Sequence, residues 1–364
     1  MNKKNILICT PFSGTGGIST WSKHIKKNYS LNPSIFNVDF FELDRRKQSN
    51  TGIERFFIGV FDYLQLYFSY KKKIKKNHPA LIHFVSSASL GLMKDLLFLT
   101  YAKREKINTV IHFRFGRIPD IIKNKNWEYR LLMKVIAKCD RVIVIDKLSY
   151  TSLLNLGINK VKLLPNPLAD RTVSIIKQIE IKREKNKIVF VGHMVETKGI
   201  LELIKACEKL TAIYDLSLSM NGLLKYDMKQ KIALMFNNKI PSWLLLNGNQ
   251  PYEKVIKEML SAAVFVLPTY TEGFPNVILE SMACGCSIVT TPVGAIPEML
   301  DKDSTENLGI FVPVKDIDAL EKAIEKMLND EAFAIHCGEK ARKKVFREYT
   351  IKKVVAQMEN IWKF

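Results

Sequence analysis

Residues Val264–Glu280 read VFVLPTYTEGFPNVILE, and their pattern of apolar and turn residues changes twice along this length. Val264–Leu267 is a short apolar run of the kind that forms a buried strand, and Pro268–Pro275 is rich in turn residues. From Asn276 onward, apolar residues recur at helical spacing. This strand, loop and helix predict one unit of a doubly wound α/β sheet, in which ligands bind at the carboxyl ends of the strands.

The same alternation of apolar runs and helical patterns extends along the chain in two series. The first series contains the runs Ile6–Cys9, Leu81–Val85, Thr109–Phe113 and Arg141–Ile145. The second contains Lys187–Gly192, Leu216–Met220, Trp243–Leu246, Val264–Leu267 and Ser287–Thr290. Because strands that alternate with helices form parallel sheets covered on both faces, we expect two Rossmann-like doubly wound domains facing a cleft.

A domain boundary is expected where the two series meet. A chain of 364 residues is longer than one hydrophobic core usually organises. Between the two series, the prolines of Pro165-Asn166-Pro167 stop regular structure and suit a hinge, and a polar stretch follows them through Lys187. We therefore expect domains at 1–168 and 169–349, with the pattern of Glu339–Phe364 indicating helix to the end of the chain.

Charge is distributed unevenly along the chain. The net charge is +20, and residues 1–170 carry 29 Lys and Arg against 12 Asp and Glu, which leaves about +3 for the rest. Such a basic first half predicts an anionic partner, namely nucleic acid, a membrane surface or a phosphorylated substrate. Lysine is abundant throughout, so compositional drift is an alternative explanation.

The cysteines and the amino terminus indicate a cytoplasmic protein. Six scattered cysteines lie mostly within apolar runs, which favours buried, reduced thiols. The first residues lack the apolar core of a signal peptide, and no run approaches the ~18 apolar residues of a spanning helix. Two Asp-x-Asp triplets, Asp301-Lys-Asp303 and Asp316-Ile-Asp318, fit a polar loop and a helix N-cap, so no metal site is predicted.

Two glutamates flank the start of the helix that begins near Asn276. Glu272 lies in the loop and Glu280 about one turn inside the helix. The positive end of a helix dipole suits a phosphate, and carboxylates accept hydrogen bonds from paired hydroxyls. The segment is thus able to hold a diphosphate between two carboxylates, although the bare spacing also fits a solvated helix surface.

The stretch Pro268–Glu298 closely resembles the signature of the retaining glycosyltransferases of family 4, also called glycosyl transferases group 1. Gly309–Pro313 and Pro165-Asn166 fall where that family has similar segments, whereas in the first half the resemblance is limited to Gly16-Gly17 and the alternating pattern. The resemblance implies the GT-B architecture, with the donor nucleotide on the second domain and the acceptor on the first. It also implies that the last helix, at about 350–364, returns to the first domain and that catalysis needs no metal.

Roles for individual residues follow from this resemblance. Glu272 would contact the donor sugar and Glu280 the ribose hydroxyls, and Lys198 would bind the donor diphosphate. The backbone that lines the sugar and phosphate would be that of Gly273, Phe274, Pro275, Asn276 and Val277. His193 stands where the family usually has an arginine, and a neutral histidine offers fewer donors and no fixed charge. Donor binding would then be weaker, or another basic residue would substitute.

The first half contributes two further candidates. Gly16-Gly17 ends the first strand and would let the backbone approach the donor's phosphate and sugar, or would form an ordinary tight turn. It is not a G-x-G-x-x-G motif, which disfavours a nicotinamide dinucleotide. His112 ends a strand, with Arg114 and Arg117 close behind and His83 as its rival, and the resemblance implies that it lies near the reacting sugar.

Residues Ile53–Lys76 read IERFFIGVFDYLQLYFSYKKKIKK and combine aromatic side chains with a lysine cluster. As a helix, this segment would lie in a membrane interface with its lysines over lipid phosphates. An ordinary core helix with a solvated lysine end explains the pattern equally well.

Together these features predict a retaining glycosyltransferase without a cofactor. It would move a sugar from a nucleotide-diphosphate sugar to a glycan or polyprenyl-diphosphate-linked acceptor, as in bacterial surface polysaccharide synthesis. Three alternatives stay open: a GT-B epimerase of the sugar nucleotide, a non-catalytic binding protein favoured by His193, and a nucleic-acid binder, for which no known motif is present.

Overall fold

The computed structural model describes residues 3–14, 16–44, 52–304, 306 and 308–364, with the side chains of 52–61 left out of the description. The chain divides into two compact units. The first unit is Met1–Asn166 with Ile351–Phe364, and the second is Pro167–Thr350. The division falls beside the boundary expected near residue 168.

The first unit is built on a parallel six-stranded sheet with the order β2-β1-β3-β4-β5-β6. Its strands are β1 (Asn5–Thr10), β2 (Asn37–Glu42), β3 (Leu81–Ser86), β4 (Asn108–Phe113), β5 (Arg141–Val144) and β6 (Val161–Leu163). Strand order reverses between β1 and β3, and in doubly wound sheets ligands bind outside the carboxyl ends at such a point.

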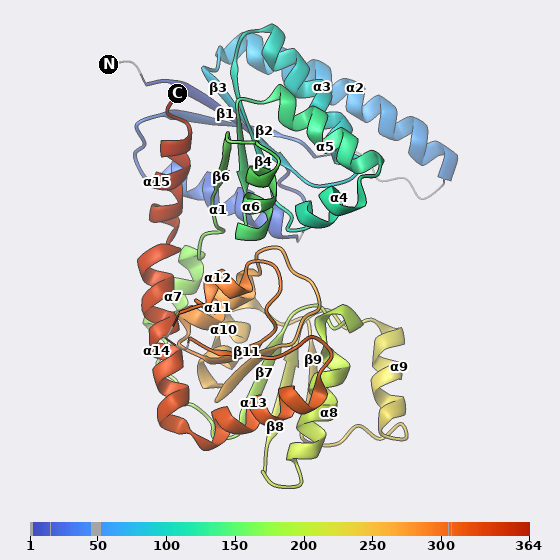
Figure 1. The fold of residues 1–364 in the computed structure, drawn as a ribbon, viewed down its shortest axis with the longest axis vertical. Helices are drawn as coiled ribbons and strands as arrows, with labels where there is room; N and C mark the ends of the chain where they lie inside the picture. The colour runs from blue at the N-terminus through green and yellow to red at the C-terminus, as the bar shows by residue number, and fades with distance from the viewer. Residues whose placement is uncertain (1–2, 15, 45–51, 305, 307) are drawn as a thin grey trace. The chain divides into compact units, whose positions relative to one another are not determined.

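Two helical layers cover this first sheet (Figure 1). On one face α1 (Gly17–Leu31) and α15 (Ile351–Ile361) enclose a core that includes Trp21, Val110 and Met358. The other face is covered by α2 (Gly52–Asn77), α3 (Gly91–Arg104), α4 (Ile118–Asn124), α5 (Trp127–Lys138) and α6 (Lys147–Asn155). The C-terminal helix is therefore part of the first unit's core, more than 180 residues after the chain has left that unit.

The second unit repeats the design, with the strand order β12-β11-β10-β7-β8-β9. Its strands are β7 (Lys187–Val191), β8 (Ser217–Asn221), β9 (Leu244–Gly248), β10 (Val264–Leu267), β11 (Ser287–Thr290) and β12 (Ile310–Phe311). The helices are α7 (Asp170–Gln178), the 3-10 turn η1 (Glu196–Lys198), α8 (Ile200–Leu210), α9 (Tyr226–Met235), α10 (Tyr252–Ser261), α11 (Asn276–Ala283), α12 (Ile296–Met299), α13 (Ile317–Asn329) and α14 (Glu331–Glu348). All residues of β10 and β11 are buried, as expected of strands covered on both faces.

Two parallel sheets with helices on both sides confirm the predicted pair of doubly wound domains (Figure 1). That the two domains face a common cleft stays a prediction. Three strands were missed, namely β2, β6 and β12, and each lies at the edge of its sheet.

Pro165-Asn166-Pro167 lies between β6 and α7, outside any helix or strand. One prediction about the connections is wrong. The C-terminal segment is not one helix, because α14 ends at Glu348 and α15 begins at Ile351. Between them, the Leu168 N–H donates to the Tyr349 carbonyl at 2.7 Å, which ties the interruption to the start of the second unit.

The aromatic and lysine-rich segment Ile53–Lys76 lies within α2. Of its described side chains, Tyr70 and Ile74 are buried in the core, whereas Leu64 and Phe68 are exposed. The segment thus has a core face and an outward apolar face. No helix in the described ranges is long and apolar enough to cross a membrane. All six cysteines are buried free thiols.

Candidate functional site

The loop Pro268–Pro275, after β10, is held on one side by the turn η1 and the residue that follows it. The Tyr270 N–H donates to the Thr197 carbonyl at 2.8 Å, and the Tyr270 hydroxyl donates to Glu202 at 2.7 Å. Gly199 has φ +69°, and a Cβ added there would lie 2.0 Å from the Pro268 carbonyl oxygen. Only glycine therefore allows the start of α8 to approach the loop this closely.

The segment before α12 holds the loop on its other side. The Ala295 N–H donates to the Gly273 carbonyl at 2.8 Å. Gly294 has φ +57°, and a Cβ added there would lie 2.4 Å from the Glu272 carbonyl oxygen. Because the backbone of Glu272 and Gly273 is fixed by these contacts, the Glu272 side chain projects from a defined position.

Glu272 forms an ion pair with Lys198, the last residue of η1. The Glu272 side chain is 13% exposed and the Lys198 side chain is 24% exposed, so the pair is only partly accessible to water. Two residues that the sequence assigned to donor sugar and donor phosphate are thus in direct contact. His193 is exposed in the loop after β7, and its carbonyl accepts the Val195 N–H at 2.9 Å.

Glu280 lies in α11 and is hydrogen-bonded by Tyr252 of α10. The Tyr252 hydroxyl donates to the Glu280 carboxylate at 2.8 Å and is 2.5 Å from the Thr172 hydroxyl of α7. Burial raises the pKa of Glu280 to about 7, although the Tyr252 hydrogen bond opposes the shift. This carboxyl group is therefore close to its titration point at neutral pH.

The start of α11 lies between these two glutamates. Pro275 is its N-cap and makes no side-chain cap hydrogen bond, and the first turn contains no acidic residue. An uncapped helix start with a positive dipole end suits an anionic oxygen. The loop, Lys198 and α11 thus place a cation, a helix start and two carboxylates within one short region of the second unit.

Gly16 and Gly17 lie at the start of α1, and neither has a positive φ. Gly16 is the N-cap with φ −76°, whereas Gly14 has φ +87°. A Cβ added at Gly16 or Gly17 would meet nothing within 4 Å. The pair therefore leaves open space beside the backbone and is not required for a tight turn.

His112 is the penultimate residue of β4 and is fully buried. Its Nδ1 is 3.2 Å from Nε2 of His83, and its Nε2 has no hydrogen-bond partner among the described residues. The predicted rivals His83 and His112 are thus direct neighbours.

The two arginines behind His112 differ in their contacts. Arg117 is paired with Glu128 at 2.7 Å. Arg114 lies 4.8 Å from the Trp21 ring, and its buried Nε and Nη1 have no partner in the part of the chain that is described. Burial lowers the pKa of Arg114 to about 9. An anionic group at Arg114 would relieve this cost, because a buried charge needs a partner.

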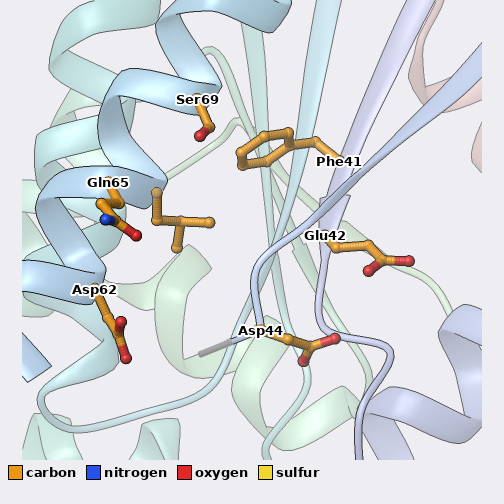
Figure 2. A pocket seen from close by; sticks show the side chains of 7 residues that line it. Phe41, Glu42, Asp44, Asp62, Gln65 and Ser69 are labelled. Atoms are coloured by element: carbon orange, nitrogen blue, oxygen red, sulfur yellow. The ribbon is translucent and has the colours of Figure 1, made fainter. Parts of the chain in front are cut away.

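A hollow that the sequence did not indicate lies beside β2 and α2 (Figure 2). Its volume is about 240 Å³. Its lining residues are Phe41, Glu42, Asp44, Asp62, Gln65, Leu66 and Ser69. Asp44 already accepts the N–H groups of Phe12 and Ser13, each at 2.8 Å, so part of this acidic lining stabilises the loop after β1. Nowhere in the described residues do three or more His, Cys, Asp or Glu side chains gather as a metal site.

Two contact residues of the candidate sites were missed by sequence reasoning. Tyr252 and Trp362 each hydrogen-bond a residue that was predicted or considered, namely Glu280 and His83. Neither carries a local sequence signal, because the contacts depend on helices that are distant in sequence.

Comparison with known proteins finds a family match in the second unit. Residues 173–344 match the family model described as glycosyl transferases group 1. The capsular polysaccharide biosynthesis glycosyltransferase CapM of Staphylococcus aureus is 25% identical over 287 residues, which are 78% of this chain and 70% of CapM. For several other similar curated relatives, the chain spans about half of their length.

Solved structures extend the likeness to the whole fold. The sucrose-phosphate synthase of Thermosynechococcus elongatus gives a TM-score of 0.74 at 17% identity, with 99% of this chain and 98% of that chain covered. HepE of Anabaena, solved in complex with UDP, gives 0.71 at 14% identity with 98% of each covered. These proteins have the GT-B fold, so the predicted fold class is confirmed.

Proposed function

We propose that this chain, which belongs to the glycosyl transferases group 1 through residues 173–344, moves a sugar from a nucleotide-diphosphate sugar to an acceptor hydroxyl with retention of configuration. The observation that carries the proposal is the Lys198–Glu272 ion pair, presented by a fixed loop beside the uncapped start of α11. This arrangement offers one charged acceptor for a sugar hydroxyl and positive charge for a leaving diphosphate.

The ion pair suggests how substrate binding prepares the site. When donor hydroxyls hydrogen-bond to Glu272, Lys198 becomes available to the diphosphate. As the bond between the anomeric carbon and the phosphate oxygen breaks, the diphosphate takes the electron pair, and Lys198 with the α11 start stabilises its new charge. The acceptor oxygen then bonds to the anomeric carbon on the same face, and its proton passes to the departing phosphate.

Glu280 is proposed to bind the ribose of the nucleotide. Its carboxylate accepts hydrogen bonds from vicinal hydroxyls, and the Tyr252 contact holds it in place. Nucleotide recognition of this kind agrees with the UDP bound to HepE. We propose that no cofactor or metal takes part, because Lys198, the backbone at 273–277 and the helix start supply the donors and the positive charge.

The basic first unit is proposed to bind the acceptor, a glycan or a polyprenyl-diphosphate-linked sugar. Arg114, His112 and the open space at Gly16-Gly17 are candidates for contact with the reacting groups. The outward residues Leu64 and Phe68 and the lysines of α2 suit peripheral attachment to an anionic membrane from the cytoplasmic side. CapM, named for capsular polysaccharide synthesis, supports a role in surface polysaccharide assembly.

The test is a panel of nucleotide sugars incubated with the purified protein and scored by mass for transfer or donor hydrolysis. We expect one donor to be consumed by the wild type and by Glu253→Gln, an exposed helix variant, but not by Glu272→Ala. An active Glu272→Ala variant would refute the assignment. Donor binding without turnover would support instead the non-catalytic alternative that His193, in place of arginine, favours.

A further inference from the structure

A chain of hydrogen bonds connects the end of the polypeptide to His112 through the interior of the first unit. Trp362, directly after α15, donates its indole N–H to Nδ1 of His83 at 2.9 Å. Nε2 of His83 is 3.2 Å from Nδ1 of His112. The three side chains are at most 2% exposed, so water does not compete for these contacts.

The direction of this chain follows from the chemistry of its first member. An indole nitrogen only donates, so Nδ1 of His83 must accept. A neutral His83 then carries its proton on Nε2 and donates to Nδ1 of His112. His112 in turn carries its own proton on Nε2, the nitrogen without a partner among the described residues.

Both rings are neutral at physiological pH. Burial, aided by the nearby Arg114 charge, lowers the pKa of His83 to about 3. Burial lowers the pKa of His112 well below its usual range, again with Arg114 contributing. Because neither ring hydrogen-bonds a carboxylate in the described structure, nothing compensates a charge on the pair.

We infer that Trp362 and His83 are positioning residues that fix His112 as the Nε2–H tautomer, so that it acts as a neutral donor toward an oxygen of the bound substrate. The buried, unpartnered Nε2–H is the group that a ligand oxygen would satisfy. Assignment of that oxygen to a hydroxyl or phosphate of the glycosyl substrates rests on the proposed function. The tautomer itself does not.

Trp362 is the residue that sets the donor-to-acceptor direction of these hydrogen bonds. If both histidines carried their protons on Nδ1, the His83 N–H would face the indole N–H and neither could accept. Replacing Trp362 by phenylalanine removes this conflict, since either direction then keeps one hydrogen bond between the two rings. The Nδ1–H form of His112 should therefore become populated only in such a variant.

The test is nitrogen-15 NMR of the full-length protein with labelled histidine, which distinguishes the two neutral tautomers and the imidazolium. We expect Nε2–H for His83 and His112 in the wild type and a mixture at His112 in Trp362→Phe. His83→Gln should keep the wild-type form at His112, because its amide oxygen accepts from Trp362 and its amide N–H donates to His112. Trp21→Phe keeps an aromatic ring beside His112 and leaves the hydrogen bonds from Trp362 through His83 to His112 in place, so it should give the wild-type tautomer.

An Nδ1–H or charged His112 in the wild type, or an unchanged tautomer in Trp362→Phe, would overturn the inference. Turnover supplies the second measurement, in the transfer assay that identifies the donor. With the competent tautomer reduced, kcat of Trp362→Phe should fall about 2- to 10-fold with little change in the donor KM. An unchanged kcat beside a shifted tautomer would refute the donor role of His112. Absence of turnover in the wild type would count against the proposed function and leave the tautomer result standing.

Discussion

Glu280→Gln should make the second unit more stable than the wild type at alkaline pH. Burial raises the pKa of Glu280 from 4.5 to about 7 in the folded protein. A carboxyl group with a raised pKa stabilises the fold while it is protonated in the folded state. This stabilisation is fully present below pH 4.5 and is lost as the pH rises through 7. Glutamine keeps the neutral form at every pH, so the variant should not show this loss.

The magnitude follows from the size of the shift. A difference of about 2.5 units at 1.36 kcal/mol per unit gives an upper value of about 3 kcal/mol. Between pH 5 and pH 9 most of this would be lost, on the order of 2 kcal/mol, because at pH 5 the unfolded chain is already largely ionised. For a unit of this size, that corresponds to a melting temperature roughly 4 to 8 °C lower in the wild type relative to the variant.

Thermal denaturation followed by circular dichroism at several pH values between 5 and 9 measures the difference directly. Glu253→Gln is the matched control, because Glu253 is exposed in α10 and its pair with Lys257 is a surface contact. The difference between the wild type and Glu280→Gln should grow as the pH rises from 5 to about 7 and level off above it, whereas the control should follow the wild type. Parallel curves for all three proteins would show that Glu280 does not titrate in this range and would refute the reasoning.

Four further perturbations separate structural from functional roles. Gly199→Ala should destabilise the protein by about 2 to 4 kcal/mol in urea denaturation, because φ is +69° and a backbone oxygen lies 2.0 Å from the new Cβ. Gly16→Ala should change the free energy of unfolding by no more than about 0.5 kcal/mol, since the added Cβ meets nothing within 4 Å. The same variant should lower transfer activity if the backbone at Gly16 approaches the substrate. Lys198→Met should weaken binding of the donor nucleotide that the panel identifies about 10- to 100-fold in calorimetry, as loss of a charge-assisted hydrogen bond implies, and unchanged affinity would exclude Lys198 from the phosphate site. Phe68→Asp should reduce co-sedimentation with anionic vesicles several-fold without changing stability, and equal binding would exclude this face of α2 from the membrane contact.

Central strands could be predicted from the sequence, and edge strands could not. Val264–Leu267 and Ser287–Thr290 are buried on both faces, so they read as uninterrupted apolar runs with the bounds found in the structure. β2 has the sequence NVDFFE and only intermediate or exposed residues, which is why its pattern was not recognised. β6 and β12 contain three and two residues, too few for any period to be visible.

The donor-side candidates were predictable because they are local in sequence. Glu272 and Gly273 lie in the loop before α11 and Glu280 lies within it, so the spacing alone places them around the start of that helix. The break at Tyr349 was not predictable, because neither it nor Thr350 is a strong helix breaker. That break is instead accompanied by a hydrogen bond from Leu168, which is distant in the sequence.

Partners of the site residues required the tertiary structure. His83 was recognised only as a rival of His112, since nothing in the sequence shows that β3 and β4 place the two rings 5.3 Å apart. Trp362 joins them only because α15 packs on the same face of the sheet. Contacts of this kind depend on strand register and on the return of the chain to its first unit.

The candidate side chains differ in their surroundings, and this gives the three groups different chemistry. Glu272 is paired with Lys198. Burial leaves Glu280 near its titration point, and the Tyr252 hydroxyl favours its charged form. His112 is kept neutral by burial, with its orientation fixed from Trp362 through His83. Since the pKa of Glu280 lies near 7, donor binding should depend on pH through the proposed contact of Glu280 with the ribose.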